Sequence, residues 1–211
     1  FPKVEAKDVS PILTSDMTAI AMGFTIIDGR PLFSNKNLAD KLADIFEITE
    51  ERFIALFADS LDKSSKAGDL LELPVSHVQI KKIYFINLGG QSREDLRKAG
   101  ASLARKVKGY SQKVLIGAGD GDIQAFVTAL LLASYSWNVK TSEKKGPSNF
   151  IVLTHSQDQQ ELVRKSITLA QGTWLARDLI HTPSNIKNPA WMAEQVSSVV
   201  RQVNGERGGL T

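Results

Sequence analysis

The segment Gly117-Ala118-Gly119-Asp120-Gly121-Asp122 combines residue types that could do chemistry at a turn. It follows an apolar stretch and opens a helical one, so its backbone N–H groups could hold a phosphate. The dinucleotide fingerprint needs a third glycine where Asp122 stands, and an acidic residue about 20 positions later, where the chain reads Trp137-Asn138-Val139-Lys140. Two aspartates in the turn would also repel a phosphate. The pattern therefore favours a tight strand-to-helix turn with an aspartate as helix N-cap.

Asp120 and Asp122 also raise the possibility of paired carboxylates for metal binding or acid–base catalysis. The neighbouring sequence supplies no third ligand, and helix capping accounts for both side chains. We therefore interpret the pair as structural.

The three histidines are the candidate zinc ligands. His77, His155 and His181 fall on three different connecting segments, and no H-x-x-x-H or H-E-x-x-H spacing occurs. The absence of cysteine excludes disulfides and thiolate metal sites. The serines that we considered as nucleophiles stand outside a G-x-S-x-G elbow: Ser10, Ser34 and Ser184. No catalytic, cofactor-binding or metal-binding residue is predicted in this chain.

The elements that would position these residues alternate along the sequence. Apolar runs bounded by turn residues predict strands at 18–27, 69–73, 81–88, 113–118 and 149–154. Helical spacing predicts helices at 38–48, 50–61, 92–109, 120–135 and 157–181. The alternation from Lys81 to His181 predicts an α/β sandwich with a largely parallel central sheet. The strands at 18–27 and 69–73 are expected as antiparallel additions at its edges.

Length and composition bound the class of protein. The chain has 211 residues, 42% of them hydrophobic and 23% charged, which suits one generous domain with an appendage. No apolar run approaches the roughly 20 residues of a membrane span, and Phe1-Pro2-Lys3 does not begin a signal peptide. A cytoplasmic setting without membrane contact is therefore expected. Phe1 in place of an initiator Met predicts a processed or trimmed chain.

The net charge of +3 raises the question of nucleic acid binding. The basic residues are scattered, and the densest group, Arg105-Lys106-Val107-Lys108, falls near a predicted helix C-terminus, where cations favour the helix dipole. Nucleic acid is therefore not the partner that we expect.

The segment 169–196 predicts a helix, a polar loop and a second helix. Pro183 should end the first helix near His181. Asn188 is a good N-cap, and Pro189 suits the first position of the second helix. Trp174 and Trp191 flank the loop. They could form a ligand-facing aromatic pair, but we interpret them as packing at an interdomain hinge.

The same segment resembles a signature of the leucyl aminopeptidase (M17) family of di-metal cytosol aminopeptidases, roughly A-R-D-L-x-N-x-P-x-N-x-x-x-P-x-x-L-A. The residues that match it are Ala176, Arg177, Asp178, Leu179, Pro183, Asn185, Pro189 and Ala193. His181 stands where the family usually has Asn, and Met192 where it usually has Leu. The upstream order of strands, Gly-rich turn and long helix is also similar.

The resemblance implies a macro-like three-layer sandwich over residues 1–156, a connector helix over 157–182 and the truncated start of a peptidase domain over 183–211. The family's catalytic motifs, T-F-D-S-G-G and N-T-D-A-E-G-R, do not occur here. The chain alone is thus expected to be inactive and to serve assembly or regulation. The intact enzyme is expected to be a homohexamer that uses two divalent cations, Mn or Zn, to remove N-terminal residues from peptides through the missing catalytic domain.

Two alternatives of other classes follow from the same residues. One is a free-standing macro-type module that binds ADP-ribose or a related nucleotide through Gly89-Gly90 and the turn at 117–121. The other is a DNA-binding domain.

Overall fold

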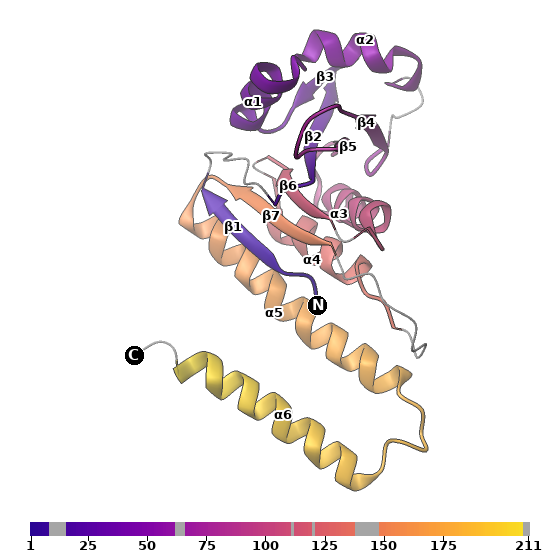
Figure 1. Ribbon diagram of the computed structural model, residues 1–211, viewed down its shortest axis with the longest axis vertical. Helices are drawn as coiled ribbons and strands as arrows, with labels where there is room; N and C mark the ends of the chain where they lie inside the picture. Colours follow the sequence, from indigo (N-terminus) through magenta and orange to yellow (C-terminus); the bar gives the residue numbers. More distant parts are fainter. Residues whose placement is uncertain (9–15, 62–65, 111, 120, 138–147, 209–211) are drawn as a thin grey trace. The chain divides into compact units, whose positions relative to one another are not determined.

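The computed structural model describes residues 1–8, 16–61, 66–110, 112–119, 121–137 and 148–208, and the side chains up to residue 201 (Figure 1). The chain divides into two compact units, Phe1–Thr173 and Trp174–Thr211. The boundary between the two units falls inside one long helix.

A seven-stranded mixed sheet forms the centre of the larger unit. Its strands are β1 (Val4–Asp8), β2 (Ala19–Ile27), β3 (Arg30–Phe33), β4 (Leu70–Pro74), β5 (Lys82–Asn87), β6 (Lys113–Gly117) and β7 (Asn149–Thr154). Their order is β1-β7-β6-β2-β5-β4, and β3 pairs with β2. The pairs β1–β7, β7–β6, β6–β2 and β2–β5 are parallel, whereas β3 and β4 pair antiparallel. The predicted α/β class with a largely parallel sheet is confirmed.

The prediction that the strand at 18–27 adds an antiparallel edge is wrong. β2 lies inside the sheet, where Ala19 aligns with Lys82 of β5 and Val114 of β6 in parallel register. Its first seven residues are all buried, as expected of a strand covered on both faces. Its antiparallel partner is β3, which follows a tight turn at Asp28 and Gly29 with φ angles of 50° and 76°.

The other edge strands show what the apolar pattern can and cannot detect. The predicted strand at 69–73 is confirmed as β4, which lies at one end of the strand order. β1 and β3 were not predicted, because β1 alternates polar with apolar residues and β3 is only four residues long.

Helices cover both faces of the sheet. α1 (Lys36–Phe46) and α2 (Glu50–Leu61) pack on one face, and α3 (Arg93–Val107), α4 (Ile123–Ala133) and the first part of α5 (Gln157–His181) pack on the other. Alternate residues of β2 supply the two cores, since Ile20 and Met22 join the first and Ala19 and Ala21 the second. This arrangement gives the three layers that were expected.

α3 and α4 approach each other closely at Gly100. A Cβ built on Gly100 would lie 2.2 Å from the carbonyl oxygen of Phe126 and 3.2 Å from the backbone nitrogen of Leu130. Leu96 and Leu103 of α3 are buried in the same core as Phe126 and Leu130. The glycine is therefore required for this helix crossing.

The smaller unit has the predicted helix–loop–helix order. α5 ends at His181, and α6 (Pro189–Gly208) begins at Pro189. The Asn188 side chain accepts a hydrogen bond of 2.9 Å from the backbone N–H of Trp191, as an N-cap should. Among the described residues, none of the helices combines the length and apolar character needed to cross a bilayer.

Candidate functional site

The carboxyl ends of β5, β6 and β7 meet at one edge of the sheet, because these strands lie in parallel register with β2 or with one another. Ligands of open α/β sheets bind at this edge. β5 is followed by Gly89 and Gly90, β6 by the turn that ends in Asp122, and β7 by His155. The structure thus brings both candidate glycine turns and one of the three candidate histidine ligands to the carboxyl ends of these strands.

Asp122 acts as the predicted helix cap. Its Oδ1 accepts a hydrogen bond of 2.9 Å from the backbone N–H of Ala125 at the start of α4. Its Oδ2 lies 3.5 Å from Nε of Arg93 at the start of α3. Asp120 lies outside the described residues, so its relation to Asp122 stays a prediction. Asp122 therefore joins the N-termini of α3 and α4.

The glycines of the turns are packed against other parts of the protein. A Cβ on Gly119, where φ is +79°, would lie 2.8 Å from Ser34, and one on Gly121 would lie 2.8 Å from Leu96. A Cβ on Gly89, where φ is +58°, would lie 2.8 Å from Ala67. Protein atoms therefore occupy the space that these glycines leave open. The backbone N–H of Gly89 also donates to Oδ1 of Asn87 over 2.8 Å, which removes one candidate phosphate donor.

A hydrogen bond between Asn35 and His155 joins two segments 120 residues apart in sequence. Asn35 is 1% exposed and caps α1, since its Oδ1 accepts from the backbone N–H of Leu38 over 2.9 Å. Its Nδ2 donates to Nε2 of His155 over 3.2 Å. A Cβ on Gly117 would lie 2.7 Å from Leu38 and 3.1 Å from Asn35, so the end of β6 packs on the same cap. Sequence reasoning missed Asn35, because the helix was predicted to begin at residue 38, whereas α1 begins at Lys36, directly after Asn35.

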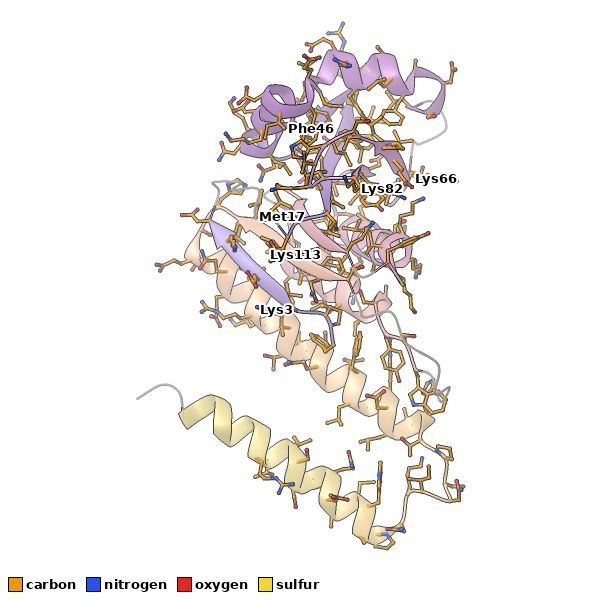
Figure 2. The ribbon with its side chains drawn as sticks, in the orientation of Figure 1. Lys3, Met17, Phe46, Lys66, Lys82 and Lys113 are labelled. Atoms are coloured by element: carbon orange, nitrogen blue, oxygen red, sulfur yellow. The ribbon has the colours of Figure 1, made fainter. Side chains whose placement is uncertain are left out.

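The other two histidines are held elsewhere by local contacts. Nδ1 of His77 accepts from the backbone N–H groups of Gln79 and Ile80, and its ring packs edge-on to Phe46, which Figure 2 labels. Nδ1 of His181 donates to the carbonyl of Arg177 over 2.9 Å. In the part of the chain that the structure describes, no group of three or more His, Asp or Glu side chains could hold a metal ion. These donors do not fit a di-metal centre.

The candidate serines and tryptophans form no reactive arrangement. Ser34 lies against Gly119, and its buried Oγ has no hydrogen-bond partner among the described residues. Ser184 is exposed in the loop between α5 and α6, and Ser10 lies outside the described residues. Trp174 and Trp191 both belong to the smaller unit and are partly exposed. Their role at a hinge stays a prediction.

A charged network ties β4 and β5 to α3. Glu72 pairs with Lys106 at 2.7 Å and with Lys82, which Figure 2 labels, through its other oxygen. Hydrogen bonds from Lys106 and then Lys82 hold the pKa of Glu72 below its usual value, against a smaller opposing effect of burial. The Lys82 ammonium also lies 5.6 Å from the ring centre of Tyr110. Lys106, from the densest basic cluster, is thus engaged in an internal ion pair, which weakens the case for a nucleic acid surface.

Comparison with known protein families identifies this architecture. The model of the cytosol aminopeptidase family, N-terminal domain, matches residues 31–144. The chain belongs to this family. The match covers β3 to α4, including the turns at Gly89 and Gly119 and the cap at Asn35. The expected resemblance to the leucyl aminopeptidases is confirmed, and the chain carries the N-terminal domain of the cytosol aminopeptidase family.

Curated relatives agree with this assignment. The "Probable cytosol aminopeptidase" of Prochlorococcus marinus is 27% identical over 177 residues, which cover 78% of this chain and 36% of the relative. That of a Picosynechococcus species is 27% identical over 166 residues, covering 71% and 34%. The chain therefore spans about a third of the length of these relatives.

Solved structures share the fold. A mutant of tomato leucine aminopeptidase superimposes with a TM-score of 0.66 at 19% identity, covering 96% of this chain and 42% of the other. The bottromycin maturation enzyme BotP superimposes with a TM-score of 0.60 at 16% identity, covering 89% and 38%. At these identities the likeness concerns the fold, and it confirms the α/β architecture.

Proposed function

We propose that this chain is the N-terminal, non-catalytic part of a leucyl aminopeptidase and serves its assembly or regulation. The observation that carries the proposal is the match to the family's N-terminal domain over residues 31–144. Two further observations support it. The chain spans about a third of the length of its relatives, and its described residues hold no cluster of metal ligands.

In the intact enzyme, two divalent cations, Mn or Zn, would activate water for attack on the N-terminal peptide bond of a peptide. Among the described residues, no group of three or more His, Asp or Glu side chains could hold such an ion. The residues of this domain would instead stabilise its own three-layer fold. The cytoplasmic location expected from the sequence belongs to the same proposal.

Residues 183–211, which lie within the smaller unit, are proposed as the start of the peptidase domain. The second helix of this unit exposes apolar side chains one turn apart, with Met192, Val196 and Val200 at 42%, 57% and 51% exposure. Ile180, near the end of α5, is 75% exposed. An apolar helix face of this kind is normally covered by other elements. The catalytic domain is the partner that we propose for it.

The sheet edges bear on how this domain would assemble. Glu5 of β1 forms ion pairs with Lys7 of the same strand and with Lys3 just before it, and β4 ends in Pro74, which has no N–H to donate. Such features oppose strand-to-strand pairing between molecules. We therefore expect the chain alone to be monomeric or dimeric rather than hexameric. Light scattering on the purified chain, whose monomer mass is 23.1 kDa, measures this directly.

An aminopeptidase assay tests the proposal. The 211-residue chain, shown to be folded by circular dichroism, is incubated with leucine p-nitroanilide and added Mn²⁺ or Zn²⁺, beside an active leucine aminopeptidase as positive control. We expect no release of p-nitroaniline above the metal blank. Metal-dependent turnover by the purified chain would show that it carries its own active site and would refute the proposal.

A further inference from the structure

An apolar groove lies on the larger unit, between β3 and the helices α1 and α2. It consists of two hollows of about 430 and 540 Å³ that share the side chains of Leu32, Glu50 and Glu51. The first hollow also has Ala39 and Ile48 in its wall. The second is also lined by residues of the hairpin and of α2: Ile27, Pro31 and Ile54. We call the two hollows together the β3–α2 groove.

Three apolar side chains that line the second hollow remain open to water. Leu32 is 49% exposed, Ile27 55% and Ile54 37%. The neighbouring Phe33 turns into the core, where its ring packs on Phe53 and Phe85. Burial of such half-exposed apolar surface favours the docking of another apolar surface.

The backbone of β3 cannot recruit an additional strand. The N–H of Ser34 bonds to Gly23 of β2, so the alternate N–H groups of β3, at positions 31 and 33, point away from β2. Position 31 is a proline without an N–H, and the N–H of Phe33 donates to Oε1 of Glu50 over 2.8 Å. A ligand of the groove therefore finds no N–H donor on this edge of β3, which favours a helix, whose backbone groups bond internally, over an added strand.

The shared part of the groove is acidic. Glu50 and Glu51 have no ion-pair partner among the described residues, whereas Asp40 at the first hollow is paired with Lys36 at 3.2 Å. Hydrogen bonds from its own backbone and from Thr49 keep the pKa of Glu51 below its usual value, so that its carboxylate stays charged. Both carboxylates lie in the first turn of α2, where the helix dipole stabilises negative charge.

Among the described residues, Arg30 is the only cation that lines the second hollow. The other side chains of its lining are apolar or acidic. No ion pair joins Arg30 to Glu50 or Glu51 among the described contacts. Glu50 and Glu51, set against the one guanidinium of Arg30, therefore leave a net negative charge where the two hollows meet.

We propose that the β3–α2 groove binds an amphipathic helix of a partner protein. Two apolar side chains of that helix enter the hollows on either side of Leu32, and a Lys or Arg between them faces Glu50 and Glu51. The apolar, basic and apolar residues follow one another along one helix face, near positions i, i+4 and i+7. This inference does not depend on the aminopeptidase proposal.

A peptide-binding experiment tests it. The probe is a labelled helical peptide with Leu, Lys and Leu at these three positions in an Ala- and Gln-rich background, and its comparator has Glu in place of Lys. Fluorescence anisotropy with the full chain should show tighter binding of the Lys peptide, by about fivefold or more at low salt. Equal helicity of the two peptides is checked by circular dichroism.

Matched variants locate the site. Leu32→Ser should weaken binding of the Lys peptide about fivefold, because a half-exposed leucine loses its contact area. Leu56→Ser should leave binding unchanged, because Leu56 is 48% exposed and lines neither hollow. Glu51→Gln should abolish most of the preference for Lys over Glu, and Asp59→Asn, an exposed carboxylate on the same helix, should preserve it.

Several results would overturn the proposal. These are no binding of the Lys peptide at about millimolar concentration, equal binding of both peptides, or equal effects of the groove variants and their controls. A chain that is dimeric by light scattering and becomes monomeric in Leu32→Ser would assign the groove to a second copy instead. Weaker binding in Leu32→Ser and a lost preference for Lys in Glu51→Gln, with both control variants and the circular dichroism unchanged, would support the helix-binding groove.

Discussion

The crossing of α3 and α4 predicts opposite effects for two glycine-to-alanine substitutions. Gly100 is buried in the crossing, and an added Cβ would lie 2.2 Å from the carbonyl oxygen of Phe126. Gly172 lies in α5 of the same unit, and an added Cβ there has no atom within 4 Å. Both positions are helical, so helix propensity favours alanine at each by about 1 kcal/mol.

The magnitude at Gly100 follows from the geometry of the contact. The obstructing atoms belong to the backbone of α4, which has no rotamer to change, so the two helices must move apart by about 1 Å. Overpacking of a core costs about 1–3 kcal/mol, and the leucines and phenylalanine beside the crossing lose contacts as the helices separate. After the gain in propensity, we expect Gly100→Ala to lower the free energy of unfolding by about 2 kcal/mol.

The assay is urea unfolding of the full chain followed by far-UV circular dichroism, with thermal unfolding as a second measurement. Gly100→Ala should lower Tm by roughly 4–8 °C for a chain of this size, and Gly172→Ala should raise the free energy of unfolding by about 0.5–1 kcal/mol. The m-values should stay equal, so that the midpoints report stability. A Gly100→Ala protein as stable as Gly172→Ala would refute the argument that the helix crossing requires glycine.

Three other substitutions test the two helix caps and the Glu72 ion pairs, each by urea unfolding. Asn35→Ala should lower the free energy of unfolding by about 2 kcal/mol, because the α1 cap and the bond to His155 are both lost; a loss below about 0.5 kcal/mol would contradict this. Asp122→Ala should cost about 1 kcal/mol through the α4 cap, and no measurable change would show that the cap is dispensable. Glu72→Gln should cost at most about 1 kcal/mol at pH 7, since its ion pairs are partly exposed to solvent. Because folding lowers the pKa of Glu72, its contribution exists above the unfolded pKa and is lost as the pH falls through the folded value. The difference between wild type and variant should therefore narrow below about pH 4, and a difference that is constant down to about pH 2 would contradict the assignment.

The local signals in the sequence predicted features that depend on near neighbours. Asp122 and Asn188 act as the N-caps that their positions before helices indicate. The strand at 82–87 is buried because its central residues, 83–86, form a continuous apolar run. Such features need only the chain a few residues away, so propensity and periodicity suffice to find them.

The position of β2 was beyond the reach of these signals. The run of apolar residues indicates a buried strand, but neither its neighbours nor their direction are encoded within it. β2 pairs with β5 and β6, which lie 60 or more residues later, and its place follows from how all the strands can bury their two faces together. The short edge strands β1 and β3 were missed for a related reason, since each is recognisable only by the longer strand that it pairs with.

By itself, the sequence determined the fold class, the helix–loop–helix segment with its family signature, and the structural role of the turn that ends in Asp122. Each depends on residue types at fixed spacing along the chain. Only the tertiary structure decided that Asn35 contacts His155, that Gly89 and Gly119 face protein atoms, and that Leu32 and Glu51 share a groove. These contacts join residues far apart in sequence, and they form only when the packed layers fix the distance between their elements.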